Sequence, residues 1–488
     1  MTNSHFFQNY NCLPTHFYSE IETEQLSKAS LLHSNQALMQ QLGLNLDETS
    51  LLNMTSGQTF PPGLQALAQK YTGHQFGYYN PDLGDGRGVL LGQFNDTNNQ
   101  QWDLHLKGSG QTPYSRRGDG RAVLRSSVRE YLIGEALHHL GIPTTRCLSL
   151  CTSPEMVQRE IFEPRASYIR IAKTHIRFGH FEWLKQQGDI EQQQQLADYV
   201  IEYVYPELKT ITDSNLRYAE LLNSIVSKTA VMIAGWQKVG FCHGVMNTDN
   251  MSVAGETFDF GPYAFLDDCK IHYICNHSDT EGRYAFSQQP NIGLWNCQIL
   301  GFAFSDLVTQ EQIDQAINLY IDTFNKQYLL NMGNKFGLAK PDQDDKLFIA
   351  ETLILMDKSQ LDFHHFFVLL KEFDSIKHHQ FETFVLQNSE NNQAWSDWIE
   401  KFRARLKQQK AEQFTELMQQ TPQVILRNYI AQEIIEAAEN QDLTPLNNWM
   451  KWLQNPHKPA KELLNIEQHD YLSPPEKQNK GLALSCSS

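Results

Sequence analysis

The sequence predicts an α+β protein with two lobes, a small β-rich lobe followed by a larger, mainly helical one. Short strand-like runs and glycine-rich turns dominate from about residue 55 to 175. Beyond about residue 190, apolar residues recur at helical intervals. A chain of 488 residues with 41% hydrophobic content can also bury two cores. We expect an N-terminal extension and first lobe at 1–165, a second lobe at 166–390, and a helical extension with a tail at 391–488.

Charge and hydropathy narrow the class of protein. The 56 acidic residues outnumber the 40 basic ones, and the formal charge of -16 disfavours nucleic acid and anionic membranes as partners. The first residues lack a basic, apolar leader, and no run of about 18 apolar residues follows. The 8 cysteines show neither CxxC nor zinc-like spacing. We therefore expect a cytoplasmic protein with mostly reduced cysteines and no membrane or nucleic-acid partner.

A glycine-rich segment, PDLGDGRGVLLGQF, precedes an apolar strand-like run. Its glycines, Gly84, Gly86 and Gly88, would let the backbone approach a phosphate or a ribose, and Arg87 could add charged hydrogen bonds. A tight hairpin with a solvated Arg87 explains the same residues, and the spacing is not GxGxxG.

The next predicted strand ends in a lysine, and the helix that follows it carries a glutamate. Alternation of apolar and polar residues from Trp102 predicts a half-buried strand that ends at Lys107, with Lys107 on its polar face. SSVREYLIGEALHHLGIP follows as a helix, with Ser126 or Ser127 as its cap and Gly141 and Pro143 as its stop. A strand lysine with a helix glutamate, here Glu130, positions a phosphate-binding lysine in kinases. A surface lysine and a solvated glutamate fit the spacing equally well.

Arginines cluster between and after these elements. Like charges four apart weaken a helix, so an anion such as a triphosphate would offset them; RNA fits less well because aromatic residues are not interleaved. Arg170 and Arg177 could converge on one anion across a turn. A plain solvated face remains an alternative for the first members of the cluster, which are Arg116, Arg117, Arg121, Arg125 and Arg129.

The most specific segment is WQKVGFCHGVMNTDNMSVAGETFDFGPYAFLDD. His243-Gly244 with Asn250 matches the catalytic-loop spacing of small-molecule kinases, and Asp259 opens a D-F-G sequence, so both Asn250 and Asp259 would hold Mg²⁺. With the β-rich and helical halves, these loops predict a protein-kinase-like fold. Val245, however, stands where a phosphotransferase carries its catalytic Asp. Asp249 is the nearest carboxylate, and it is either a base or a support of the loop.

The remaining chain is predicted to be helical. Helical periodicity runs through LLNSIVSKTAVMIAGWQKVG, EQIDQAINLYIDTFNKQYLL and WIEKFRARLKQQKAEQFTELM. From His457 onward the chain is polar, proline-containing and aperiodic, which predicts an extended or mobile tail.

With these motifs the chain resembles the selenoprotein O family of protein adenylyltransferases, pseudokinases that bind ATP inverted relative to kinases. The resemblance is strongest from YTGHQFGYYNPDLGDGRG at Tyr71 to NHSDTEGRYAFSQQPNIGLWN near Trp295, and the terminal SCSS matches too. It implies that the α-phosphate lies beside the metal and the base, with the β- and γ-phosphates in a basic pocket. The nucleotide contacts that it implies are Gly84, Gly86, Arg87, Lys107, Asp119, Gly120, Arg170, Arg177 and Asp259.

The resemblance also implies the chemistry. Glu130 would orient Lys107, Asn250 and Asp259 would bind Mg²⁺, and Asp249 would accept the proton of a protein Ser, Thr or Tyr hydroxyl that attacks the α-phosphorus. The acceptor would be another protein or the enzyme itself. Neither metal radius nor base contacts follow from these motifs, so Mn²⁺ and UTP remain open beside Mg²⁺ and ATP.

Redox control is a further implication of the family. A disulfide would join Cys486 to a cysteine beyond the D-F-G loop, with Cys275 the first candidate and Cys269 the second. A free thiol on the tail is the alternative.

Two other functions fit part of the sequence. A small-molecule or protein kinase would fit the HG and DFG elements, but Val245 argues against it. A catalytically inactive ATP-binding scaffold is the other rival, and the presence of both Asn250 and Asp259 argues against it.

Overall fold

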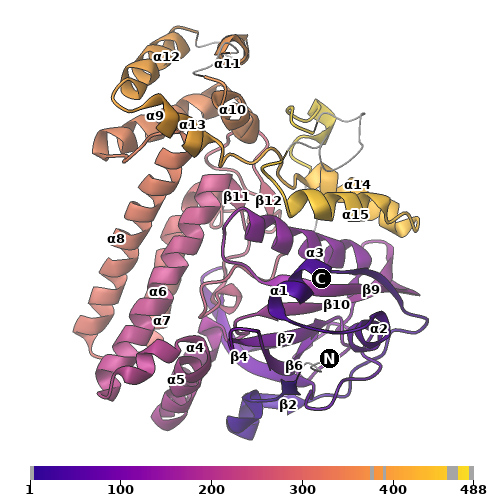
Figure 1. Ribbon diagram of the computed structural model, residues 1–488. Helices are drawn as coiled ribbons and strands as arrows, with labels where there is room; N and C mark the ends of the chain where they lie inside the picture. The colour runs from indigo at the N-terminus through magenta and orange to yellow at the C-terminus, as the bar shows by residue number, and fades with distance from the viewer. Residues whose placement is uncertain (1–4, 374–377, 388–391, 459–470, 483–488) are drawn as a thin grey trace.

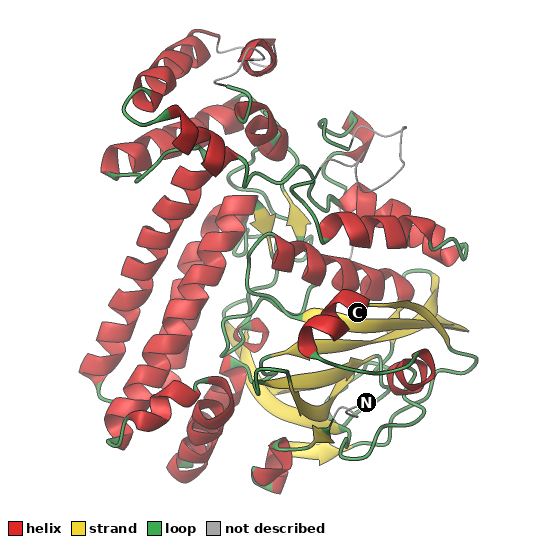
Figure 2. Cartoon of the chain, in the orientation of Figure 1, coloured by secondary structure: helices red, strands yellow, loops and turns green. Residues whose placement is uncertain are grey.

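The computed structural model describes residues 5–373, 378–387, 392–458 and 471–482. Its N-terminal part is an antiparallel sheet, and the rest of the described chain is largely helical (Figures 1 and 2). The predicted α+β class and the order of its two parts are therefore confirmed. None of the described helices is long and apolar enough to cross a membrane.

The strands of the main sheet run in the order β2-β4-β6-β7-β10-β9-β3, with β1 on β6, β5 on β4 and β8 on β10. Their neighbours pair antiparallel throughout. The strands are β1 (Phe6–Phe7), β2 (Tyr18–Glu20), β3 (Ser30–Ser34), β4 (Leu67–Gln75), β5 (Tyr78–Gly84), β6 (Gly88–Asn95), β7 (Gln101–Lys107), β8 (Ala122–Val123), β9 (Arg146–Gln158) and β10 (Phe162–Ala172).

The strand predicted to end at Lys107 is β7, and its end is confirmed. Its predicted half-burial is wrong, because Asp103, His105 and Lys107 on the polar side are also buried. β7 is a central strand that is covered on both faces, so its polar side chains need partners inside the protein.

Helices α1 (Gln36–Leu42) and α2 (Glu48–Thr55) lie with the N-terminal sheet, while α3 (Leu124–His139) crosses its other face. The helix α3 was predicted, but no serine caps it: Val123 is its N-cap, and Ser126 and Ser127 donate back to the Val123 carbonyl. Gly141, with φ 77°, follows its end as expected.

The helical part begins beside the sheet and extends away from it. Figure 1 shows α6, α7 and α8 running side by side, α9 to α13 beyond the end of α8, and α14 and α15 over α3. The helices are α4 (Phe178–Gln187), α5 (Ile190–Val204), α6 (Ser214–Val239), α7 (Gln289–Ala303), α8 (Gln310–Lys335), α9 (Gln343–Lys358), α10 (Phe363–Leu370), α11 (His378–Gln387), α12 (Asn392–Leu406), α13 (Ala411–Met418), α14 (Asn428–Glu439) and α15 (Thr444–Leu453).

The three helical predictions for this part are confirmed. The periodic run at 398–418 is divided between two helices, α12 and α13. The segment predicted to be an extended or mobile tail is described at 471–482, where it contacts the rest of the chain. There the Gly481 amide and the Lys480 ammonium bond to Asp267 and Asp268, and Asn428 donates to the Leu482 carbonyl.

One hydrophobic core joins the two halves. Side chains under the sheet, on α3 and on α4 to α8 belong to the same buried cluster as α14 and α15. A second core lies between the sheet and α1 and α2, and a third holds α9 to α13 against the small β11 (Phe241–Cys242) and β12 (Ala264–Phe265) pair. Because β11 and β12 flank the predicted catalytic loops, those loops are anchored on packed structure.

Candidate active site

A cavity of about 1170 Å³ lies where the sheet meets the loops that follow β11. The glycine segment, β7, the arginine-rich stretch and both predicted catalytic loops contribute to its wall. Arg170 and Glu130 lie behind the wall, in contact with lining residues. The predicted residues that line the cavity are Gly84, Gly86, Arg87, Lys107, Asp119, Gly120, Arg177, Asp249, Asn250 and Asp259.

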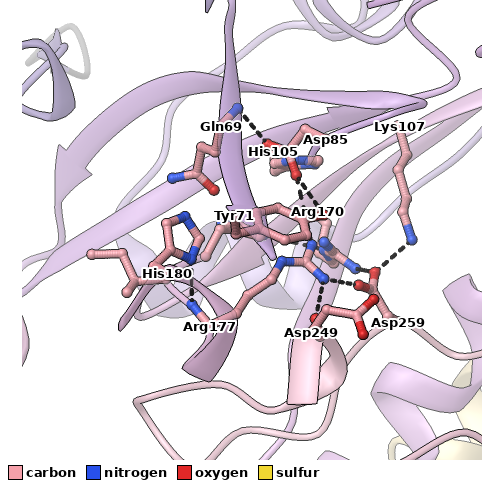
Figure 3. A network of polar contacts seen from close by, with 12 residues as sticks. Gln69, Tyr71, Asp85, His105, Lys107, Arg170, Arg177, His180, Asp249 and Asp259 are labelled. Carbon is pink, nitrogen blue, oxygen red and sulfur yellow. Dashed lines mark hydrogen bonds and ion pairs between the residues drawn. The ribbon is translucent and has the colours of Figure 1, made fainter. Parts of the chain in front are cut away.

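Three cations converge on Asp259 (Figure 3). Lys107 Nζ lies 2.7 Å and an Arg170 nitrogen 2.6 Å from Oδ1, and Arg177 donates to Oδ2. Burial opposes ionisation of this carboxyl, but the charges of Arg177, Lys107 and Arg170 hold its pKa well below the usual range. Asp259 is therefore an ionised, half-buried carboxylate. Its φ of 56° is unusual outside glycine and is typical of functional positions.

The predicted lysine–glutamate pair is present. Glu130 Oε2 lies 3.3 Å from Lys107 Nζ, and Glu130 Oε1 accepts a 3.1 Å hydrogen bond from Arg170. Burial raises the pKa of Glu130, but Lys107 and Arg170 outweigh it, so the pKa is lowered. The side chain of Lys107 is thus held between Glu130 and Asp259, pointing at the cavity from the end of β7.

Arg177 joins the two predicted catalytic loops. It precedes α4 and donates to the Asp249 carbonyl at 2.7 Å as well as to Asp259. Its guanidinium also packs on the rings of Tyr71 and Phe258, 4.7 and 4.6 Å from their centroids. The predicted convergence of Arg170 and Arg177 is therefore confirmed, with Asp259 as the anion.

Asp249 lies in the short turn Thr248–Asn250 and is buried beside the cavity. Oδ2 accepts a 3.1 Å hydrogen bond from Gln75, whereas Oδ1 is buried without a partner among the described residues. Burial raises the pKa of Asp249 to about 6, against the opposing effect of Arg177. A carboxyl that can exchange a proton near neutral pH suits a general base.

Asn250 and Asp259 fit a hard divalent cation. The Asn250 Nδ2 donates to the Val245 carbonyl at 3.1 Å, which leaves its amide oxygen free to face the cavity. Carboxylate and amide oxygens are the ligands that Mg²⁺ prefers. The described residues hold no group of three or more His, Cys, Asp or Glu placed as a metal site, so phosphate and water oxygens would complete the coordination sphere.

The arginine-rich stretch divides into two parts. Arg116 and Arg117 are exposed at the cavity, and Asp119 there pairs with Arg159 at 2.9 Å. Farther along, the expectation of an anionic ligand is wrong: Arg125 pairs with Glu163, and Arg129 donates to the Tyr263 carbonyl. Gly120 has φ 68°, and a Cβ there would lie 2.0 Å from the Gly110 carbonyl oxygen, so only glycine fits.

Several polar residues at the site were not predicted. Asp85 of the glycine segment turns inward and bonds to His105 and to the Gln69 amide, so the segment is a buried anchor rather than the hairpin considered above. Asp103 holds His175, which in turn accepts from Arg170. The alternation along β7 places Asp103 and His105 on its polar face. Alternation alone does not show that this polar face is buried.

The predicted redox cysteines lie in different situations. Cys275 and Cys269 are buried thiols, and burial raises the pKa of Cys275 well above its usual value. The Sγ of Cys275 lies 3.4 Å from that of Cys242. Cys486 falls outside the described residues, so its predicted disulfide stays a prediction.

Comparison with known proteins gives close matches over nearly the whole chain. The family described as "Protein adenylyltransferase SelO" matches residues 1–454. A protein nucleotidyltransferase YdiU of Hydrogenovibrio crunogenus is 49% identical over 484 residues, covering 98% of this chain and 98% of that protein. Those of Photobacterium profundum and Erwinia tasmaniensis are 41% and 44% identical, covering 99% and 97% of this chain and 98% and 97% of those proteins.

Proposed function

The chain belongs to the SelO family of protein adenylyltransferases and is a protein nucleotidyltransferase, and we propose that it transfers AMP from ATP to hydroxyl groups of proteins. The acceptor hydroxyls are those of Ser, Thr or Tyr side chains, on other proteins or on the enzyme itself, and pyrophosphate leaves. The observation that carries the proposal is the replacement of the usual catalytic aspartate by Val245, with Asp249 nearby as a buried carboxyl that has a free oxygen.

The proposed architecture is protein-kinase-like, with a C-terminal extension. Kinases hold a nucleotide with a strand lysine, a helix glutamate and two metal-binding loops in this order. Here the corresponding residues are Lys107 on β7, Glu130 on α3, and Asn250 and Asp259 on the loops beyond the sheet. The division at 1–165, 166–390 and 391–488 stays a proposal, and its first boundary falls within β10.

ATP would bind in the cavity with its phosphates inverted relative to kinases. Asp249 is the carboxyl proposed as the base, and it lies beside Asn250 at the cavity wall. The phosphorus that is attacked must therefore lie at this end of the cavity. Cations on the glycine and arginine loops, together with Arg159 after β9, then accommodate the β- and γ-phosphates. The residues proposed for this role are Arg87, Arg116, Arg117 and Arg159.

In the proposed reaction the acceptor oxygen bonds to the α-phosphorus as the bond between that phosphorus and the bridging oxygen breaks. Asp249 takes the hydroxyl proton, and the electron pair of the broken bond leaves on pyrophosphate. Lys107, already held by Glu130, offsets the charge that develops on the phosphates. Asn250 and Asp259 would hold Mg²⁺, or Mn²⁺, which would polarise the phosphoryl oxygens when bound.

The test uses ATP labelled on either the α- or the γ-phosphate, with the reduced enzyme, Mg²⁺ and a cell lysate. Protein labelling from the α-position alone supports AMP transfer. Labelling from the γ-position alone would make the protein a kinase despite Val245, and no labelling from either would favour an ATP-binding scaffold. Replacing ATP by labelled UTP and Mg²⁺ by Mn²⁺ in parallel defines the nucleotide and the metal.

A further inference from the structure

The turn between β4 and β5 reaches from the sheet onto the catalytic loop. The His74 amide donates to Thr248 Oγ1 at 2.7 Å, and the Phe76 amide donates to Asn247 Oδ1 at 3.2 Å and to the Tyr284 hydroxyl, outside that loop, at 2.9 Å. The turn residues Phe76 and Gly77 both have positive φ, 51° and 87°, a two-residue turn that matches the twist of a hairpin. A bulky residue rarely adopts this conformation, so the contacts with the loop hold the hairpin tip in place.

A chain of side-chain amides runs through this hairpin to Asp249. The Asp82 backbone amide donates to Asn80 Oδ1 at 3.0 Å. Asn80 Nδ2 donates to Gln75 Oε1 at 3.1 Å, and Gln75 Nε2 donates to Asp249 Oδ2 at 3.1 Å. Because a backbone N–H can only donate, it determines which end of each amide faces the next residue.

The direction of the chain decides how the two oxygens of Asp249 differ. Gln75 must present its NH₂ group, since its oxygen is already occupied by Asn80. Oδ2 of Asp249 therefore accepts the hydrogen bond from Gln75, whereas Oδ1 is buried without a hydrogen bond in the described part of the structure. An acceptor hydroxyl in the cavity could satisfy that oxygen, and such an unpaired buried oxygen is otherwise costly to keep.

We propose that Gln75 and Asn80 are positioning residues, which together hold the carboxylate of Asp249 so that Oδ1 faces the hydroxyl that is to be adenylylated. This inference rests on the proposed function. The side chains of Gln75 and Asn80 are not what attaches the hairpin tip, because the backbone amides of His74 and Phe76 bond to Thr248 and Asn247 of the loop. Losing the side-chain amides should therefore disturb the base and leave the hairpin in place.

Four variants test the proposal: Gln75→Leu, Asn80→Leu, the two together, and Asp82→Ala as a matched control. The control keeps the backbone N–H that starts the chain, and the Asp82 side chain is exposed. For each, kcat and KM for AMP transfer to a fixed acceptor are measured from α-labelled ATP, together with the Kd for MgATP and the thermal midpoint.

Loss of the hydrogen bond to Asp249 should lower kcat by about tenfold in each single variant, with the Kd for MgATP and the thermal midpoint near those of the wild type. The double variant should be no slower than Gln75→Leu, because Asn80 acts only through Gln75. Asp82→Ala should match the wild type.

Wild-type kcat in Gln75→Leu, or effects of the two substitutions that multiply, would overturn the positioning role. A parallel loss of MgATP binding or of thermal stability would also overturn it, since the amides would then only support the fold. Absence of AMP transfer by the wild type is a distinct result, because it overturns the proposed function and this inference with it.

Discussion

At the residue scale, the two aspartates of the catalytic loops have opposite proton affinities. Asp259 is surrounded by three cations, which hold its pKa well below the usual range despite burial. Asp249 is buried with one amide donor, and burial dominates and raises its pKa to about 6. Environments that separate the pKa values of paired groups commonly separate their roles, and in the proposed reaction Asp259 stays an anion while Asp249 accepts a proton.

The role of Asp249 is tested by Asp249→Asn. The amide has nearly the same size but cannot take the hydroxyl proton, so kcat for AMP transfer should fall by about 100-fold or more, while MgATP still binds. Steady-state kinetics and a nucleotide-binding isotherm measure the two quantities. Asp322→Asn on an exposed turn of α8 is the matched control and should leave both unchanged. Unchanged transfer by Asp249→Asn would remove this residue from the reaction.

The pKa of Asp249 also predicts a pH dependence. A base must be ionised, so kcat should decline as the pH falls through about 6, the value to which burial raises this pKa. A pH–rate profile at saturating MgATP and acceptor measures the decline. In Asp249→Asn any residual rate should lose that acidic limb, and an unchanged limb would assign it to another group.

At the element scale, α3 connects the active site to the C-terminal helices. Glu130 on its buried face reaches Lys107 at the end of β7. One turn farther on, Glu135 pairs with Arg146 of β9 through two hydrogen bonds, of 2.6 and 2.8 Å. Because α14 and α15 pack on the same helix, a shift of α3 would move the Lys107 pair and the C-terminal helices together.

The Glu135–Arg146 pair should stabilise the fold in a pH-dependent way. Burial opposes ionisation of Glu135, but the nearby His139 ring and the hydrogen bonds from Arg146 lower its pKa to about 2, from 4.5. A lowered carboxyl pKa contributes stability that is present above the unfolded value and is lost as the pH falls toward the folded one. Glu135→Gln should therefore destabilise the protein by about 3 kcal/mol at neutral pH.

Urea unfolding at about pH 7 and about pH 3 measures this effect, because the wild-type contribution shrinks over that range. The wild type and Glu135→Gln should be closer in stability at the lower pH. A difference that is the same at both values would mean that packing of the side chain, and not its charge, holds α3 to β9.

At the scale of the whole molecule, the sheet and the helical part share a core, and a buried arginine holds the C-terminal helices to the rest of the helical part. Arg427, at the start of α14, is almost fully buried and bonds to Asp267 at 2.8 Å and to Asp362 at 2.9 Å. These aspartates lie just after β12 and just before α10, so one guanidinium ties the C-terminal helices to the segment that follows the D-F-G loop.

Arg427→Leu should be strongly destabilising, because it leaves the buried carboxylate of Asp362 and the half-buried one of Asp267 without their cation. The expected loss in the free energy of unfolding is about 3–5 kcal/mol. Denaturant unfolding measures it, and limited proteolysis shows whether α14 and α15 detach first. Lys401→Ala is the control, since its ion pair with Glu351 is exposed and should be worth under about 1 kcal/mol. Equal losses in both variants would contradict a special role of Arg427.

From the sequence by itself follow the α+β class, the strand ending at Lys107 and the helix that carries Glu130. The spacing left the pairing of Lys107 with Glu130 level with a solvated pair, and the structure decided for the pairing. Periodicity and motif spacing depend on residues close together in the sequence, so they can be recognised without knowledge of the fold. Only the tertiary structure decided four other features. They are the burial of the polar face of β7, the partners of Arg125 and Arg129, the break between α12 and α13, and the packing of residues 471–482.

The free oxygen of Asp249 belongs to that second group. It exists because a hairpin from the sheet delivers Gln75 to one side of the carboxylate, across a sequence separation of 174 residues. No local pattern encodes such a contact, since it depends on how the sheet is placed against the catalytic loop.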